Sequence, residues 1–129
     1  MHSIFNPRPA ILAVLLSFSA VTAIAAGAHD HTPKNGGVVV ETKAGDMEIV
    51  AKSDRIQIFI SDHGKAMTLE GAKAKVTLLN GGEKVEAELT AAGDKLEAKG
   101  TFKVTKGTKG IAVVTLTGKP AVTARFEMK

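Results

Sequence analysis

The 129-residue chain contains no cysteine. This absence excludes disulfides, thiol catalysis, iron–sulfur clusters and zinc sites built from thiolates. The folded state must therefore be stabilised by an apolar core, which about a hundred residues can supply. Any metal site must use histidine, methionine, carboxylate or backbone nitrogen ligands, and the chain has four histidines and four methionines.

Aromatic side chains are also scarce, because the chain has five phenylalanines and neither tryptophan nor tyrosine. Proteins that bind nucleic acids commonly stack bases on aromatic rings and gather basic residues on one surface. Here the net charge is only +4, and the basic residues are mostly lysines scattered among acidic residues. We expect a solvated surface and no nucleic-acid partner.

The common catalytic motifs are missing as well. The sequence has no G-x-S-x-G, no H-E-x-x-H, no P-loop and no G-x-G-x-x-G. Ser61, Asp62 and His63 are consecutive, but neighbours on a strand point to opposite faces and do not form a catalytic triad. We predict that the protein is not an enzyme.

The first 28 residues have the layout of a secretory signal peptide. Arg8 precedes an almost wholly apolar run over 10–26, and the sequence A-G-A at 26–28 fits the small-residue cleavage rule. A membrane anchor is the competing interpretation, but the run is short for a helix that spans a bilayer. We therefore expect cleavage, export to a bacterial periplasm and no stable membrane anchor afterwards.

The remainder of the sequence is typical of a β-domain. Residues 29–35 are polar and contain a proline, which predicts an extended histidine-containing arm. From residue 36 on, apolar and polar residues alternate, and turn residues recur about every eight to twelve positions. This pattern predicts one all-β domain over 36–129, an antiparallel β-sandwich or small barrel of seven or eight strands. The expected strands are 38–41, 46–52, 55–61, 72–80, 83–90, 94–104, 110–118 and 121–128.

Two local features refine the expected strands. An Asn-Gly pair at 80–81 favours a tight hairpin, because both residues tolerate a positive φ. The segment 83–92 is rich in helix-forming residues, but its apolar residues alternate with charged ones, which favours a strand. The inward faces are expected to supply the following core residues: Ile56, Ile58, Ile60, Val76, Leu78, Val85, Leu89, Leu96, Phe102, Val113, Leu116 and Phe126.

The most specific chemistry lies just after the leader, in the sequence His29-Asp30-His31. If cleavage follows Ala28, the α-amino group, two amide nitrogens and the His31 imidazole form a square of ligands suited to Cu(II) or Ni(II). Cleavage after Ala25 also fits the rule and leaves two imidazoles without an N-terminal chelate. The competing interpretation is that these residues are an ordinary polar tail.

His63 follows an expected strand within the sequence Asp62-His63-Gly64, where formation of a turn is the simplest explanation. Loops at strand ends also carry binding residues, and an arm that folds back near this loop would add a third imidazole to the site. A carboxylate would then complete a tetrahedral shell. Met67 offers a thioether of the kind that favours Cu(I). The candidate metal ligands are His29, His31, His63, Asp30, Asp62 and Met67.

These motifs resemble the small periplasmic β-domains associated with bacterial heavy-metal efflux. Such domains occur at the N-terminus of periplasmic adaptor subunits and as stand-alone exported proteins. The resemblance covers roughly residues 29–90 and rests on the following positions: His29, His31, Gly36-Gly37, Glu48-Ile49 and Asp62-His63-Gly64-Lys65. Asn35 departs from the family pattern, which often has histidine there, and an amide does not replace an imidazole as a strong ligand.

The resemblance implies a periplasmic protein that binds a transition-metal ion and buffers it or delivers it to an efflux complex. Copper is favoured, with nickel, cobalt and zinc open, and we expect a monomer. Binding should weaken below a pH of about 6.5, the ordinary value for histidine, because imidazoles must be neutral to bind a metal. The alternative is an exported β-sandwich that docks another protein and has no metal role.

Overall fold

The computed structural model describes residues 31–129, which form nine β-strands and no helix. No helix in this part of the chain is long and apolar enough to cross a membrane. The all-β prediction is therefore confirmed for the described residues, whereas the expected signal peptide at 1–28 lies outside them. The strands are β1 (Val38–Thr42), β2 (Gly45–Ala51), β3 (Arg55–Asp62), β4 (Lys65–Ala66), β5 (Lys73–Asn80), β6 (Glu83–Ala92), β7 (Lys95–Lys99), β8 (Lys109–Thr115) and β9 (Val122–Glu127).

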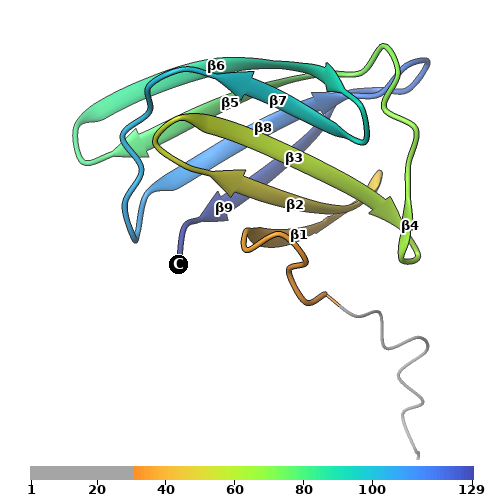
Figure 1. The fold of residues 1–129 in the computed structure, drawn as a ribbon, viewed down its shortest axis with the longest axis horizontal. Helices are drawn as coiled ribbons and strands as arrows, with labels where there is room; N and C mark the ends of the chain where they lie inside the picture. The colour runs from red at the N-terminus through yellow and green to blue at the C-terminus, as the bar shows by residue number, and fades with distance from the viewer. Residues whose placement is uncertain (1–30) are drawn as a thin grey trace, which may run out of the picture.

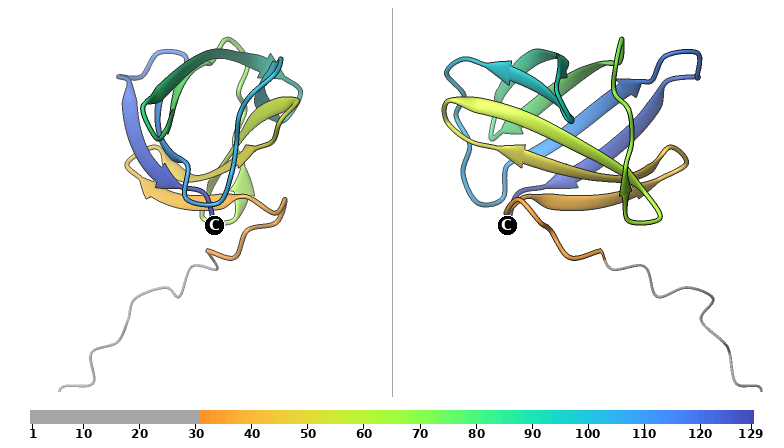
Figure 2. Two further views of the ribbon diagram at one scale, coloured as in Figure 1. Left: turned by 90° about the vertical axis from the view of Figure 1, so that its left-hand side faces the viewer. Right: turned by 45° about the vertical axis from the view of Figure 1, so that its right-hand side comes forward.

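The strands make one antiparallel sheet in the order β1-β2-β3-β7-β6-β5-β8-β9, with the short β4 paired to β3. The sheet curls until its two end strands, β1 and β9, come into contact. Viewed along the axis, the ribbon forms a nearly closed ring (Figure 2, left), and the strands cross the molecule obliquely in Figure 1. Of the two predicted architectures, the structure is the small barrel.

The barrel is filled by the inward-pointing residues of alternating strands. Ile56, Ile58 and Ile60 of β3 are at most 2% exposed, as their period-two spacing predicts. Segment 83–92 is the strand β6 and not a helix. Most of the expected core residues are confirmed, and Val85 lies half-buried against the core. Methionine fills this core too, since Met47 is fully buried.

Val113 was wrongly expected in the core, because it is 36% exposed on the outer face of β8. Ala112 and Val114, its neighbours, point inward and are at most 1% exposed. The run of apolar residues in this strand does not by itself show which face is buried. The contact of Gly110 with Phe126 shows which face of β8 is buried, because the phenylalanine ring occupies the space that a side chain at 110 would need.

The expected strand 94–104 is shorter, because β7 ends at Lys99. Beyond it the chain leaves the sheet, and the amides of Gly100 and Phe102 donate to the carbonyls of Asp54 and Ser53. Phe102 is 9% exposed and packs with the core residues. Phe102 therefore belongs to the core as predicted, but it enters from a connection and not from a strand.

The hairpin between β5 and β6 lies where the sequence predicts it, between the expected strands 72–80 and 83–90. Asn80 pairs with Glu83, so the two-residue loop is Gly81-Gly82 and Asn80 is the last residue of β5. Only Gly81 of these residues has a positive φ, of 63°. A positive φ at the first central residue alone is typical of a type II′ turn, in which glycine is favoured at that position.

Candidate functional site

The chain preceding β1 is fastened to the outer face of β2 by one carboxylate. Glu48 points outward from β2, yet it is only 7% exposed. Its Oε2 accepts hydrogen bonds from the amides of Asn35 (2.8 Å) and Gly37 (2.9 Å), and its Oε1 accepts from the amide of Lys34 and the side chain of Asn35, each at 3.0 Å. We call residues 31–37 the docked arm. It is held in place, not a loose tail.

The ionisation of Glu48 reflects this arrangement. Burial raises the pKa of the carboxyl group, but the donors of Gly37, Asn35 and Lys34 act against burial, and the net result is a pKa below the ordinary value. Several N–H donors aimed at one carboxylate favour its charged form. Glu48 is therefore an anion whose negative charge is stabilised by hydrogen bonds from the arm's own N–H groups.

Two residues of the docked arm are fitted to this contact. A side chain at Gly37 would place its Cβ 2.3 Å from the carbonyl oxygen of Ile49, so only glycine allows the arm to lie this close to β2. Asn35 donates through its side chain to Glu48. The asparagine that departs from the resembled pattern therefore fastens the arm instead of binding a metal.

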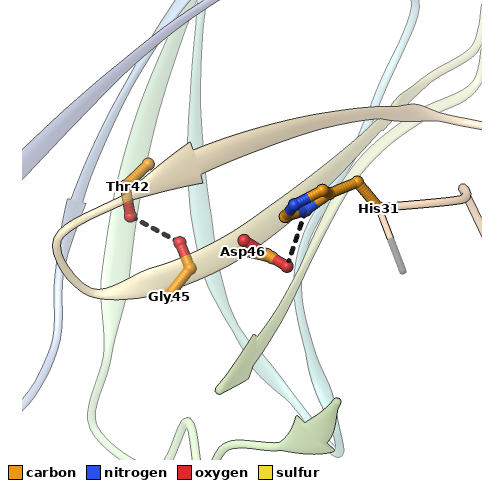
Figure 3. A network of polar contacts seen from close by, with 4 residues as sticks. All are labelled: His31, Thr42, Gly45 and Asp46. Atoms are coloured by element: carbon orange, nitrogen blue, oxygen red, sulfur yellow. Dashed lines mark hydrogen bonds and ion pairs between the residues drawn. The ribbon is translucent and has the colours of Figure 1, made fainter. Parts of the chain in front are cut away.

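Docking of the arm brings His31 against the first residues of β2. The Nδ1 atom of His31 lies 3.2 Å from Oδ2 of Asp46, and the two side chains are 45% and 22% exposed. Figure 3 shows the imidazole and the carboxylate facing each other above the start of β2, beside the turn where the Thr42 hydroxyl donates to the Gly45 carbonyl. The contact is a hydrogen bond in which Nδ1 donates when it carries the ring proton, because a carboxylate oxygen accepts.

His63 lies in a tight turn between β3 and β4. Asp62 pairs with Lys65, which leaves His63-Gly64 as a two-residue loop with φ values of 49° and 81°. These values match a type I′ hairpin turn. Among residues 31–129, His63 is the one non-glycine residue with a positive φ. Its Nε2 lies 3.4 Å from Oδ1 of Asp62, and both side chains are exposed.

The docked arm and the His63 turn border one depression of about 540 Å³ on the outside of the barrel. Thr32 and Asn35 of the arm, His63 of the turn and Asp46 of β2 all line it. Asp46 is paired in register with Ser61, one residue before Asp62, which explains why the two segments are neighbours. The docked arm and the His63 turn therefore border the same depression, which is the proximity that the sequence hypothesis requires.

The remaining candidate ligands are placed less favourably. Met67 is half-buried against the core, and its amide donates to the carbonyl of Ile60. His29 and Asp30 lie outside the described residues. Within 31–129, no three histidine, aspartate or glutamate side chains converge in a group able to hold a metal ion.

Comparison with known proteins adds no assignment. No family model, no curated protein and no solved structure matches the chain. The resemblance to metal-efflux domains therefore remains an expectation from short motifs.

Sequence reasoning missed the two acidic residues that organise the site. Asp46 and Glu48 belong to an expected strand, where both read as solvent-facing positions. One available signal was that Glu48 lies between Met47 and Ile49 and is followed only by apolar residues to the end of the strand. A carboxylate in such a strand needs a hydrogen-bonding partner if it is covered.

Proposed function

We propose that this is an exported, monomeric, non-enzymatic protein that binds a transition-metal ion and buffers it or delivers it to an efflux complex in the periplasm. The proposal combines the sequence expectation with one structural observation. His31 is paired with Asp46 at the edge of a depression that His63 also lines.

The observation supports metal binding because of how histidine ligands are usually held. A histidine that binds a metal through one ring nitrogen commonly donates its other ring N–H to a carboxylate, which orients the ring and raises its basicity. The His31–Asp46 pair has this geometry. Glu48 supplies the rigidity, because it fixes the arm only three residues further along.

His31 and His63 are the described ligands in this proposal, and His29 and Asp30 would add further donors from outside the described residues. Copper is favoured if processing leaves His31 at position three of the mature chain, and nickel, cobalt and zinc are the other candidates. Asp62 and Met67 are auxiliary ligands at most, since Asp62 already contacts His63 and Met67 packs against the core.

The test is a calorimetric titration of the processed protein with Cu(II), Ni(II) and Zn(II), after mass spectrometry has fixed its N-terminus. We expect saturable binding of at least one ion and a loss of tenfold or more in affinity for His31→Ala. His63→Asn keeps the turn, because asparagine tolerates a positive φ, so any loss of affinity in this variant reports the imidazole alone. An absence of heat above buffer controls would exclude metal binding and favour the protein-docking alternative.

A further inference from the structure

The chain contains two Asn-Gly sequences, at residues 35–36 and 80–81, and both lie in the described part of the structure. Asparagine is among the chemically labile residues, and a glycine after it leaves the next main-chain nitrogen open to the asparagine side chain. In deamidation this nitrogen attacks Cγ and forms a cyclic imide, and the side-chain nitrogen leaves as ammonia with the displaced amide proton. Water then opens the imide at either carbonyl, which leaves aspartate or isoaspartate. Water is the only co-reactant, no electron is transferred and no enzyme is needed.

The side chain of Asn35 is restrained by the carboxylate of Glu48. Its Nδ2 donates to Oε1 at 3.0 Å, and its main-chain amide donates to Oε2 at 2.8 Å. Nδ2 is the nitrogen that deamidation expels, so the reaction requires this hydrogen bond to break. Attack at Cγ also puts negative charge on the side-chain oxygen, and the ionised Glu48 beside it opposes that charge. Asn35 is exposed to water, so these contacts with Glu48, and not burial, slow deamidation at this position.

The attacking nitrogen is not restrained in the same way. Glu48 accepts hydrogen bonds from the main-chain amides of residues 34, 35 and 37, whereas the amide of Gly36 is not among its donors in the docked arm. A Cβ at Gly36 would meet nothing within 4 Å, so no neighbouring group crowds the ring that deamidation forms. The Gly36 nitrogen is therefore ready to react once the Asn35 side chain is released.

We propose that Asn35 is a deamidation site controlled by docking of the arm. Glu48 protects the asparagine while the arm is docked, and modification prevents docking afterwards. The product carries a carboxylate at position 35, where it faces the ionised Glu48, and two like charges at one site repel each other. Isoaspartate also adds a methylene to the main chain between the amides of residues 35 and 37, which Glu48 binds together. Release of the arm thus becomes covalent and permanent, whether or not the protein binds a metal.

Asn80 is the internal reference for this reaction. It makes none of the hydrogen bonds with Glu48 described above, and its strand β5 pairs with β6 and β8 and not with the strand that carries Glu48. A change in the docked arm should therefore leave the deamidation rate at Asn80 unaltered. Loosening of the whole barrel should raise the rate at both asparagines.

The first test follows both sites in the wild-type protein, Glu48→Gln and Gly37→Ala during incubation in mildly alkaline buffer, with peptide mapping by mass spectrometry. Glu48→Gln should deamidate at Asn35 about tenfold faster than the wild type, which is the factor that one hydrogen bond to a charged group is worth. Gly37→Ala retains Glu48 but shifts the arm, so we expect a smaller increase at the same site. The rate at Asn80 should be the same in all three proteins. Equal rates at Asn35 in the three proteins, or an equal increase at both sites, overturns control by the docked arm.

A second comparison tests whether modification prevents docking. Asn35→Asp reproduces the charge of the product and should raise the equilibrium constant for unfolding by about tenfold or more, because repulsion replaces a hydrogen bond to a charged group. Asn80→Asp is the matched control and should raise that constant by less than about fivefold, since it places one carboxylate opposite Glu83 at the tip of a hairpin. Denaturant unfolding measures both changes. An Asn35→Asp variant as stable as the wild type overturns the effect of modification on docking.

Discussion

The two histidine–aspartate pairs of this barrel are built in different ways. His31 and Asp46 are 15 residues apart and meet only because the arm docks on β2, whereas His63 and Asp62 are neighbours in a tight turn. Asp46 of the first pair is half-buried, whereas both side chains of the second pair are exposed. A pair that depends on tertiary structure can be lost by changes elsewhere in the molecule, while a pair within one turn survives wherever the turn does. Mutations that release the docked arm should therefore disrupt the His31–Asp46 pair and leave the His63–Asp62 pair intact.

Of the changes considered, Glu48→Gln should have the largest effect, and it should disturb the His31–Asp46 pair while leaving the His63–Asp62 pair unchanged. Glutamine places an amide group, itself a donor, against the N–H donors of the arm, so hydrogen bonds of Asn35 and Gly37 are lost. We expect a loss of about 3 kcal/mol in the free energy of unfolding, since hydrogen bonds to a buried charge are worth more than neutral ones. Denaturant unfolding measures the loss. NMR should show altered His31 resonances and unaltered His63 resonances, and an undisturbed His31 would contradict the role given to Glu48.

Gly37→Ala tests the close approach of the arm to β2. The added Cβ collides with the carbonyl oxygen of Ile49, so the arm must shift and weaken its bond from Gly37 to Glu48. Overpacking of this kind costs about 2 kcal/mol. Gly82→Ala is the matched control, since nothing lies within 4 Å of a Cβ there and its φ is not positive. Equal thermal midpoints for the two variants would argue against a tight fit at Gly37.

Acid should loosen the docked arm before it unfolds the barrel. The folded pKa of Glu48 lies below the ordinary value of 4.5, so its stabilising contribution is complete above that pH and is lost as pH falls through the lower folded value. Unfolding free energies measured in steps between about pH 7 and pH 3 should fall more steeply for the wild type than for Glu48→Gln. Identical slopes would mean that Glu48 does not anchor the arm electrostatically.

The smallest effect is expected for a change in the His63–Asp62 pair. His63 has a φ of 49° in the turn between β3 and β4, a region in which asparagine is favoured over histidine. His63→Asn should therefore raise the free energy of unfolding by about 0.5 kcal/mol. A stabilised variant that also binds metal less tightly would indicate that histidine is kept at this position for function. Destabilisation would show that the imidazole contributes to folding through contacts with its surroundings.

The period-two pattern of the sequence was sufficient to predict the strands, because each strand of a small barrel buries one face. It failed where that alternation is absent. The all-apolar centre of β8 did not show that Val113 faces outward, because the deciding contact is between Gly110 and Phe126 in another strand. The end of β7 was not predicted, because beyond it the amides of Gly100 and Phe102 bond to the carbonyls of Asp54 and Ser53 instead of to a neighbouring strand. These partners are distant in the sequence.

The two described histidines of the candidate site can be singled out from the sequence, whereas the contacts that hold them in place cannot. His31 and His63 stand out because histidine is rare in the chain, and His63 in a turn follows from its neighbours. The contacts of Glu48 with Gly37 and of Asp46 with His31 join residues that are 11 and 15 positions apart. No local pattern encodes such contacts, since an acidic residue on the outer face of a strand is ordinarily solvated.

The account is tested most directly by long-range ¹⁵N NMR of the processed protein, with one equivalent of Zn(II) added as a diamagnetic probe. If His31 is a ligand oriented by Asp46, its Nε2 resonance shifts on binding while Nδ1 keeps the resonance of a protonated nitrogen. Imidazole resonances of His31 that do not change with equimolar Zn(II) would contradict the account.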